Sequence, residues 1–229
     1  MTATEMSLAF DRLYDNIMSN QAPGLNEYEK SCFLTEAQET LAIELYNMFE
    51  VNEAARVSLA PLLKTVSLGE GILEDGTITD YSYVFTLPDD VWYKVWEGAT
   101  ICDEDLACKG KPYRKVEVVP CKLNDLSRTV DNPFRGPNER RVLRLDMGDG
   151  LVEIVSKYEI SDYMLRYVAK PAPIITADLS NTGLTIDSKT AVSEPTLPES
   201  THAQIVRLAV QSAKAVWFST GVEQEDDKD

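Results

Sequence analysis

Residues 127–157, SRTVDNPFRGPNERRVLRLDMGDGLVEIVSK, contain the turn and the strand pair around which the rest of the chain is arranged. Residues 128–144 of this stretch carry five arginines: Arg128, Arg135, Arg140, Arg141 and Arg144. The second half has apolar residues alternating on both sides of Gly148-Asp149-Gly150, and an Asp-Gly pair between two such runs is a strong hairpin signal. The stretch therefore predicts a basic turn that leads into a β-hairpin.

Strand patterns continue on both sides of this hairpin. The segments rich in Val, Ile, Thr, Tyr and Trp are 65–68, 77–87, 90–101, 114–123 and 162–179. Short turns join them, with no pattern for a crossover helix, so we predict an antiparallel sheet or sandwich. Residues 123–134 have room for one helical turn capped by Asn124. On a regular strand, Trp92 and Trp96 share one face and Tyr93 takes the other.

Helical periodicity dominates both ends of the chain. Apolar residues at spacings of three and four predict a helix over 5–19, and Thr2 with Glu5 has the form of a capping box. A short helical turn is expected over 26–32. A second helix is expected to begin at Thr35, which has the form of a capping box with Gln38, and a third to follow a cap at Asn52 and end near Pro61. The last expected helix covers 199–219, with a stripe from Ile205 through Val216 to Trp217 that we expect to pack on the N-terminal helices.

These patterns predict an α+β fold in which the N-terminal helices and a long C-terminal helix form a bundle, with the β region between them. The expected divisions are 1–64 for the N-terminal helices, 65–179 for the β region, and 180–229 for a polar loop, the last helix and an acidic tail. The tail, GVEQEDDKD, has few apolar residues and is expected to be disordered.

Few residues suggest chemistry. His202 is the single histidine, and no glycine-rich nucleotide-binding loop is present. Residues 146–150 suggest a calcium loop at first glance, but lack the regular oxygen ligands of one, so a hairpin turn is the better interpretation. Cys32, Cys102, Cys108 and Cys121 match no common zinc spacing and are expected to be free thiols. We therefore expect no catalytic residues, no cofactor and no metal. Separately, the start of the chain does not look like a signal peptide.

The net charge of −16 argues against general nucleic-acid binding, which needs clustered cations. Two interpretations of the arginine cluster remain equal. It is either a solvated, self-paired surface or a guanidinium patch that binds the acidic face of a neighbouring copy. Trp92 and Trp96 belong either to the core or to an interface, where aromatic residues are enriched.

Several idiosyncratic strings carry a resemblance to a known family. They include LTEAQETLAIELYN, LPDDVWYKVWE, NPFRGPNERRVLRLD, YMLRYVAKPAPIITADL and LPESTHAQIVRLAV. Read together, they resemble the head–tail connector ring, or tail-adaptor, proteins of crAss-like gut bacteriophages. More distantly, the helices joined to a β region are similar to the tail tubular protein A family of short-tailed phages.

The resemblance implies a structural virion protein, not an enzyme. Its copies would form a ring, typically twelve-fold, between the portal and the tail. They would contact the portal protein and other ring or tail proteins, with no membrane partner. Double-stranded DNA would pass through the lumen without specific binding, and the acidic balance suggests a lumen lined by carboxylates. The protein would be made in the bacterial host cytoplasm and end in the virion.

The expected subunit interface comprises the five arginines together with Trp92 and Trp96. Charge reversal at Arg140 and Arg141 should then impair assembly and leave the monomer folded. The alternatives are a monomeric protein-binding module and another tail or neck protein without ring symmetry.

Overall fold

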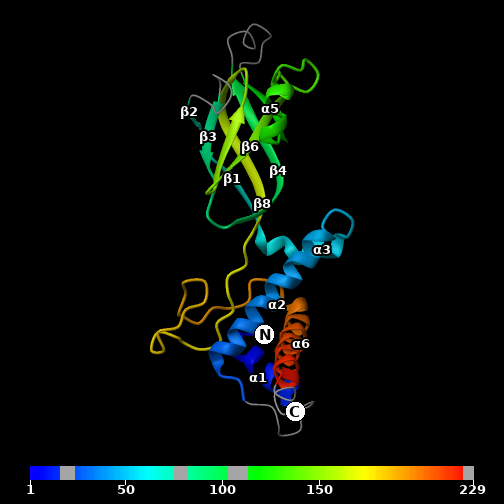
Figure 1. The fold of residues 1–229 in the computed structure, drawn as a ribbon, viewed down its shortest axis with the longest axis vertical. Coiled ribbons are helices and arrows are strands. Elements are labelled where there is room, and N and C mark those ends of the chain that lie inside the picture. The colour runs from blue at the N-terminus through cyan, green and yellow to red at the C-terminus, as the bar shows by residue number, and fades with distance from the viewer. Residues whose placement is uncertain (16–23, 75–81, 103–112, 224–229) are drawn as a thin grey trace. The chain divides into compact units, whose positions relative to one another are not determined.

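The computed structural model describes residues 1–15, 24–74, 82–102 and 113–223, and it divides into two compact units (Figure 1). The helical unit comprises Met1–Leu62 and Lys170–Asp229, and the sheet unit comprises Leu63–Ala169. Residues 170–179, which the sequence assigned to the β region, fall in the helical unit. The expected α+β class is confirmed.

The helices of the helical unit are α1 (Ala3–Asp15), α2 (Glu27–Asn47), α3 (Glu53–Leu59) with a 3₁₀ turn at Ala60–Leu62, and α6 (Glu199–Glu223). The capping box at α1 is confirmed, since the Thr2 amide donates to Glu5 and the Glu5 amide donates to the Thr2 hydroxyl. The cap of α3 is also confirmed, because Asn52 Oδ1 accepts from the Ala54 amide. The helix over 5–19 was expected to extend into residues that lie outside the described part.

The expected start of α2 at Thr35 is wrong. The helix begins eight residues earlier, where Asn26 and Glu29 form a complete capping box. Thr35 lies inside the helix and its hydroxyl donates to the Ser31 carbonyl, so it does not interrupt the helix. A threonine followed three residues later by a glutamine therefore resembled a cap without acting as one.

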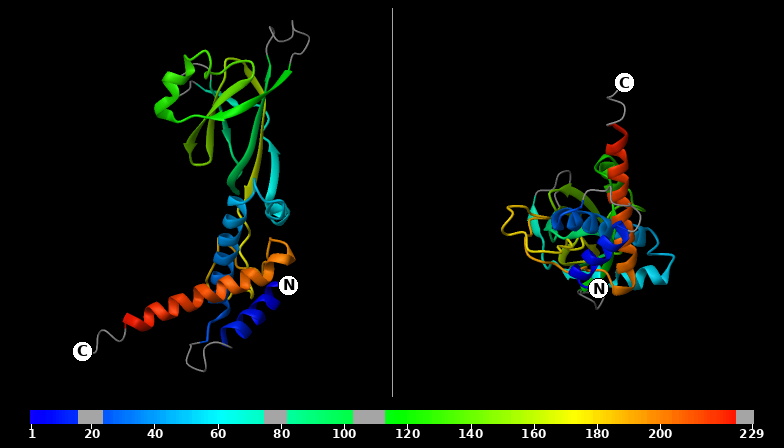
Figure 2. Two further views of the ribbon diagram at one scale, coloured as in Figure 1. Left: turned by 90° about the vertical axis from the view of Figure 1, so that its right-hand side faces the viewer. Right: turned by 90° about the horizontal axis from the view of Figure 1, so that it is seen from below.

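The core of the helical unit lies among α1, α2 and α6, and α6 runs beside α1 in Figure 2. Phe10 and Leu41 are buried, as are Ile205 and Ala209 on α6. Val216 belongs to the stripe that was expected to pack, but it is 53% exposed. The buried face of α6 therefore does not extend as far as this residue. The side chain of Trp217 lies outside the described residues.

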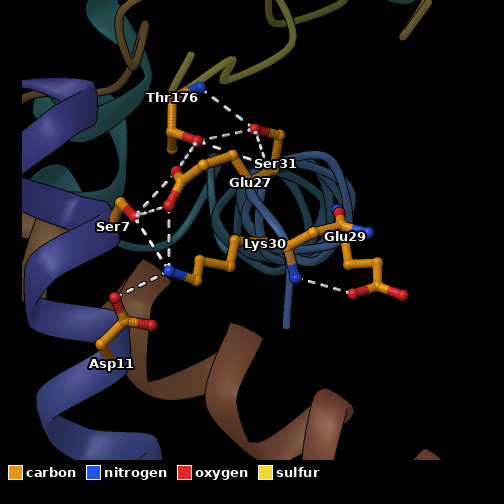
Figure 3. Close-up of polar contacts among 8 residues, drawn as sticks. Ser7, Asp11, Glu27, Glu29, Lys30, Ser31 and Thr176 are labelled. Carbon is orange, nitrogen blue, oxygen red and sulfur yellow. Dashed lines mark hydrogen bonds and ion pairs between the residues drawn. The ribbon is translucent and has the colours of Figure 1, made fainter. Parts of the chain in front are cut away.

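A polar cluster joins α1 and α2 to the extended segment after Lys170 (Figure 3). Lys30 is 6% exposed, and its Nζ contacts Asp11 at 2.7 Å and Glu27 at 3.0 Å. The Glu27 carboxylate also accepts from the hydroxyls of Ser7 and Thr176. Because these partners come from three segments distant in the sequence, the cluster fixes how they pack on one another.

The sheet unit contains eight described strands in a single sheet, in the order β1-β8-β4-β5-β6-β7-β3-β2, and one helix, α5 (Leu123–Val130). The strands are β1 (Leu63–Ser67), β2 (Ile72–Glu74), β3 (Ser82–Thr86), β4 (Val91–Cys102), β5 (Tyr113–Pro120), β6 (Arg141–Gly148), β7 (Leu151–Val155) and β8 (Glu159–Ala169). The order is not sequential, and three neighbouring pairs, β1 with β8, β8 with β4 and β7 with β3, join strands that are distant in the chain.

The strands form a single sheet, which is one of the two arrangements expected. The expectation that all of them pair antiparallel is wrong, because β5 and β6 pair in parallel with α5 in the connection between them. Parallel neighbours need such a crossover. The crossover is short and α5 spans only two turns, which is why the sequence suggested an isolated helical turn. Asn124 does not cap it, since the residue at the N-cap is Lys122.

The sheet curls back on itself around its core. Phe85 of β3 and Tyr163 of β8 lie five places apart in the strand order, which in a flat sheet would separate them by about 24 Å at about 4.8 Å per strand. Their ring centroids are 5.0 Å apart. The enclosed cluster also includes Ile101, Val142 and Ile154, all of which are fully buried.

The hairpin expected at residues 148–150 is confirmed. β6 and β7 pair antiparallel, and Gly148 lies opposite Leu151. The two turn residues, Asp149 and Gly150, have φ values of 49° and 72°, as a type I′ turn requires.

Candidate subunit interface: a basic groove beside α5

The helix α5 covers the outer side of the hairpin strands. Leu126 is fully buried and forms a small cluster with Leu143, Leu145 and Val155. Neighbouring positions of β6, such as Val142, face the enclosed core instead. Both faces of β6 are therefore covered, and the exposed side of α5 carries Arg128 in its last turn.

The chain after α5 folds into a tight loop against the end of that helix. Asn132 Oδ1 accepts from the amides of Phe134 and Arg135, and the Gly136 amide donates to the Asn132 carbonyl at 2.7 Å. A Cβ at Gly136 would lie 2.5 Å from the Val130 carbonyl oxygen, so this position has no room for a side chain. These contacts fix the backbone of the loop at Arg135, and so the point from which the Arg135 side chain extends.

Three of the predicted arginines meet around one hollow. Arg128 from α5, Arg135 from the loop and Arg141 from the start of β6 line a groove of about 890 Å³. Lys122 and Asp125 also line it, so four cationic side chains face one carboxylate. We call this hollow the basic groove. The sequence placed these arginines close together in the chain, and the structure shows that they face a common space.

The guanidinium groups in the basic groove lack acidic partners within the described part of the chain. Arg128 and Arg135 are exposed, and neither makes an ion pair with a described residue. Arg141 donates from Nη1 to the Phe134 carbonyl at 3.2 Å, while its buried Nε has no hydrogen-bond partner among the described residues. The interpretation as a self-paired surface therefore finds no support in this groove.

Arg140 and Arg144 lie elsewhere. Arg140 is exposed beside the groove without lining it. Arg144 is 8% exposed, and its guanidinium pairs with Glu97 and, at 3.1 Å, with Asp146. The Arg144 side chain is thus occupied within the sheet unit.

Arg144 belongs to a network inside the curled sheet. Glu97 accepts from both Arg144 and the Tyr163 hydroxyl, and Asp146 also pairs with Lys94. Burial, followed by the negative charge of Glu97, raises the pKa of Tyr163 far above its ordinary value. Burial alone would raise the pKa of Asp146, but the hydrogen bond from Lys94 and the charge of Arg144 outweigh it and lower that pKa.

The two tryptophans proposed for the interface lie on β4, where the pairing with β8 is irregular. Register shifts fall between Val91 and Tyr93 and between Lys94 and Trp96. The expected alternation is therefore wrong here, and the rings of Trp92 and Tyr93 pack together at 5.0 Å. Trp96 is 51% exposed and its ring lies over Gly98, where a Cβ would come within 2.6 Å of it.

Sequence reasoning missed Phe134. This residue is 85% exposed at the tip of the loop, next to Arg135. An aromatic residue between proline and arginine in a polar turn was the available signal, because a loop tip offers no core for it to enter. Exposed aromatic and arginine side chains side by side are typical of interface centres.

Other chemistry is sparse in the described residues. No group of three His, Cys, Asp or Glu side chains is placed there to hold a metal ion, and Cys32, Cys102 and Cys121 are free thiols. Cys108 lies outside the described residues. His202 is buried, and its Nε2 lies 2.9 Å from the Leu197 carbonyl oxygen. No described helix is both long and apolar enough to cross a membrane.

Comparison with known proteins places this geometry in context. A family model described as phage tail ring protein 3/4 matches residues 1–224. The chain belongs to this family. Ring protein 3 of Bacteroides phage crAss001 is 38% identical over 221 residues, which cover 93% of this chain and 95% of the relative. Ring protein 4/5 of the same phage is 34% identical over 239 residues, with 95% and 94% covered. The resemblance found in the sequence is confirmed.

Proposed function

We propose that the protein is a structural subunit of an oligomeric ring in the neck of a tailed phage, between the portal and the tail. The observation that carries the proposal is the family match along residues 1–224, together with two relatives that are both named ring proteins. The similarity spans nearly the full length of these relatives, so it includes both units of the fold. The proposal contains no catalytic role.

The proposed assembly is a twelve-fold ring that contacts the portal protein on one side and other ring or tail proteins on the other. Double-stranded DNA would pass through its lumen during ejection without specific binding. The net charge of −16 supports this, because carboxylates along the lumen repel phosphates. A ring structure with a neutral or basic bore would contradict this part of the proposal.

The proposed contact between subunits uses the basic groove, the exposed Phe134 next to Arg135 in the loop, and Trp96 on β4. Arginine suits such a contact because its planar fork binds carboxylates through two hydrogen bonds. A ring also requires that each copy present two different surfaces, since a head-to-tail contact joins unlike patches. The sequence also predicts that the long C-terminal helix packs in a bundle. In the proposed ring, a neighbouring copy completes this packing by covering the exposed part of α6 near Val216.

Measuring the mass of the assembled protein tests the proposed function. The purified chain alone, and the chain mixed with the portal protein of the same phage, are analysed by multi-angle light scattering and negative-stain imaging. A closed ring under either condition is expected, and annular particles should be visible. A chain that stays monomeric and does not bind the portal protein would overturn the proposal.

A further inference from the structure

The basic groove differs in charge from the rest of the chain. Four cationic side chains line it against the single carboxylate of Asp125, in a protein with 38 acidic and 22 basic residues. Arg128 and Arg135 are exposed and make no ion pair with any residue in the described ranges. The groove is therefore suited to a ligand that brings several negative charges.

Its volume of about 890 Å³ exceeds what a single carboxylate side chain fills. Pockets of about 300–1,000 Å³ usually enclose a drug-sized ligand, so a groove of this size accommodates a short peptide segment. The guanidiniums come from the helix, the loop and the strand, and they line the groove from separate elements. A segment with closely spaced carboxylates would engage more than one of them at a time.

The chain contains one segment with this composition. Residues 223–229, EQEDDKD, hold five carboxylates and one lysine in seven residues. Apart from windows that overlap this segment, no window of seven residues has more than three acidic residues. We infer that the basic groove binds the acidic segment 223–229 of a second copy of this chain.

This inference rests on the proposed ring. A head-to-tail ring needs a donor surface and a different acceptor surface on every copy. The groove belongs to the sheet unit, and residues 223–229 belong to the other unit, so each chain carries both halves of the contact. Charge complementarity of this kind also raises the association rate and selects the partner.

Charge swapping in the full-length chain tests the inference. The groove variant carries Arg128→Glu and Arg135→Glu, and the tail variant carries Glu225→Lys, Asp226→Lys and Asp227→Lys. Arg141 is left unchanged because it supports the loop through the Phe134 carbonyl. Lys157→Glu, an exposed lysine outside the groove, is the matched control.

Each variant alone should associate at least about ten-fold more weakly in sedimentation velocity, while the control behaves as the native chain. A mixture of the two variants should regain assembly as alternating copies, because the acidic tail of one binds the native groove of the other and the basic tail of that copy binds the acidic groove. The chain that carries both sets of changes should regain assembly. Native assembly by both single variants, or no recovery in the combined chain, would overturn the inference and leave the ring proposal standing.

A peptide experiment gives a readout that does not need the ring. A labelled peptide, GVEQEDDKD, is added to the tail variant, and its binding is followed by fluorescence anisotropy. Binding should weaken with added salt and fall about ten-fold or more when the groove substitutions are also present. A peptide in which amides replace the carboxylates should not bind. Equal binding with and without the groove arginines, or preferential binding of a short DNA duplex to the groove, would contradict the inference.

Discussion

Gly136 shows how one residue determines the geometry of the basic loop. It lies where three carbonyl oxygens, those of Thr129, Val130 and Asn132, would each be within 3.0 Å of an added Cβ. The sequence RGP suggested a turn, but the need for glycine comes from the end of α5, which only the folded chain brings there.

Gly136→Ala should therefore displace the loop and lower the free energy of unfolding by roughly 1–3 kcal/mol, as overpacking does. Urea denaturation measures this. Gly24→Ala is the control, because a Cβ there would meet no atom within 4 Å. Equal stability of the two variants would argue against the crowded geometry at Gly136.

Arg144 differs from the other arginines in what surrounds it. Sequence spacing placed it in the same patch, whereas its guanidinium pairs with Glu97 inside the sheet unit. The spacing of residues along one strand could not reveal this, because Glu97 lies 47 residues away on β4, whose pairing with β8 has three register shifts.

Arg144→Met should destabilise the sheet unit by about 3–5 kcal/mol, because it leaves the buried carboxylate of Glu97 without its cation. Adding Glu97→Gln to that variant should restore part of the loss, since the unpaired charge disappears. Thermal and urea unfolding of the single and double variants measure the coupling. A double variant that is less stable than Arg144→Met would contradict the pairing.

At the scale of elements, the hairpin turn and two of the four caps expected from the sequence are confirmed, while the caps at Thr35 and Asn124 are not. The capping box of α1, the Asn52 cap and the Asp149-Gly150 hairpin depend on contacts within a few residues, so local sequence defines them. Thr35 misled because its hydroxyl can bond either to a cap position or back to the preceding turn. Thr35 lies inside the helix because Asn26 caps α2 earlier in the chain and because α2 packs along its length.

The cluster around Lys30 gives the helical unit a dependence on pH. Burial alone would raise the pKa of Glu27, but hydrogen bonds from Thr176, Lys30 and Ser7 outweigh burial and lower it. A carboxyl whose pKa is lower in the folded chain stabilises the fold above its unfolded pKa of about 4.3. This contribution is lost as the pH falls through the folded pKa.

Glu27→Gln should accordingly be less stable than the native chain near pH 7, by about 1 kcal/mol because the carboxylate is partly exposed. The difference should shrink as the pH falls from about 5 toward the folded pKa, because protonation removes the same charge from the native chain. Urea midpoints across this range measure it, with Glu44→Gln, an exposed position on the same helix, as the control. A difference that grows in acid would contradict the assigned direction.

At the scale of the whole molecule, composition and periodicity predicted the α+β class, while the strand order was not predictable. Each strand pattern shows which residues face a core but not which strand lies beside it. The parallel pair of β5 and β6, and the contact between Phe85 and Tyr163, arise from long-range pairing and from the curl of the sheet. The arginines were singled out because they are close in sequence, but the sequence did not show that only three of them line a common groove.

The central claim is that copies of this chain form a ring in the neck of a phage particle. The most direct test is a cryo-electron microscopy reconstruction of the virion neck, with the density assigned by fitting both units of the fold. A closed ring of this chain, coaxial with the portal and about twelve-fold, is the expected result, with the basic groove of each copy at the contact with its neighbour. A neck that lacks the chain, or holds it as isolated copies without contacts between them, would contradict the claim.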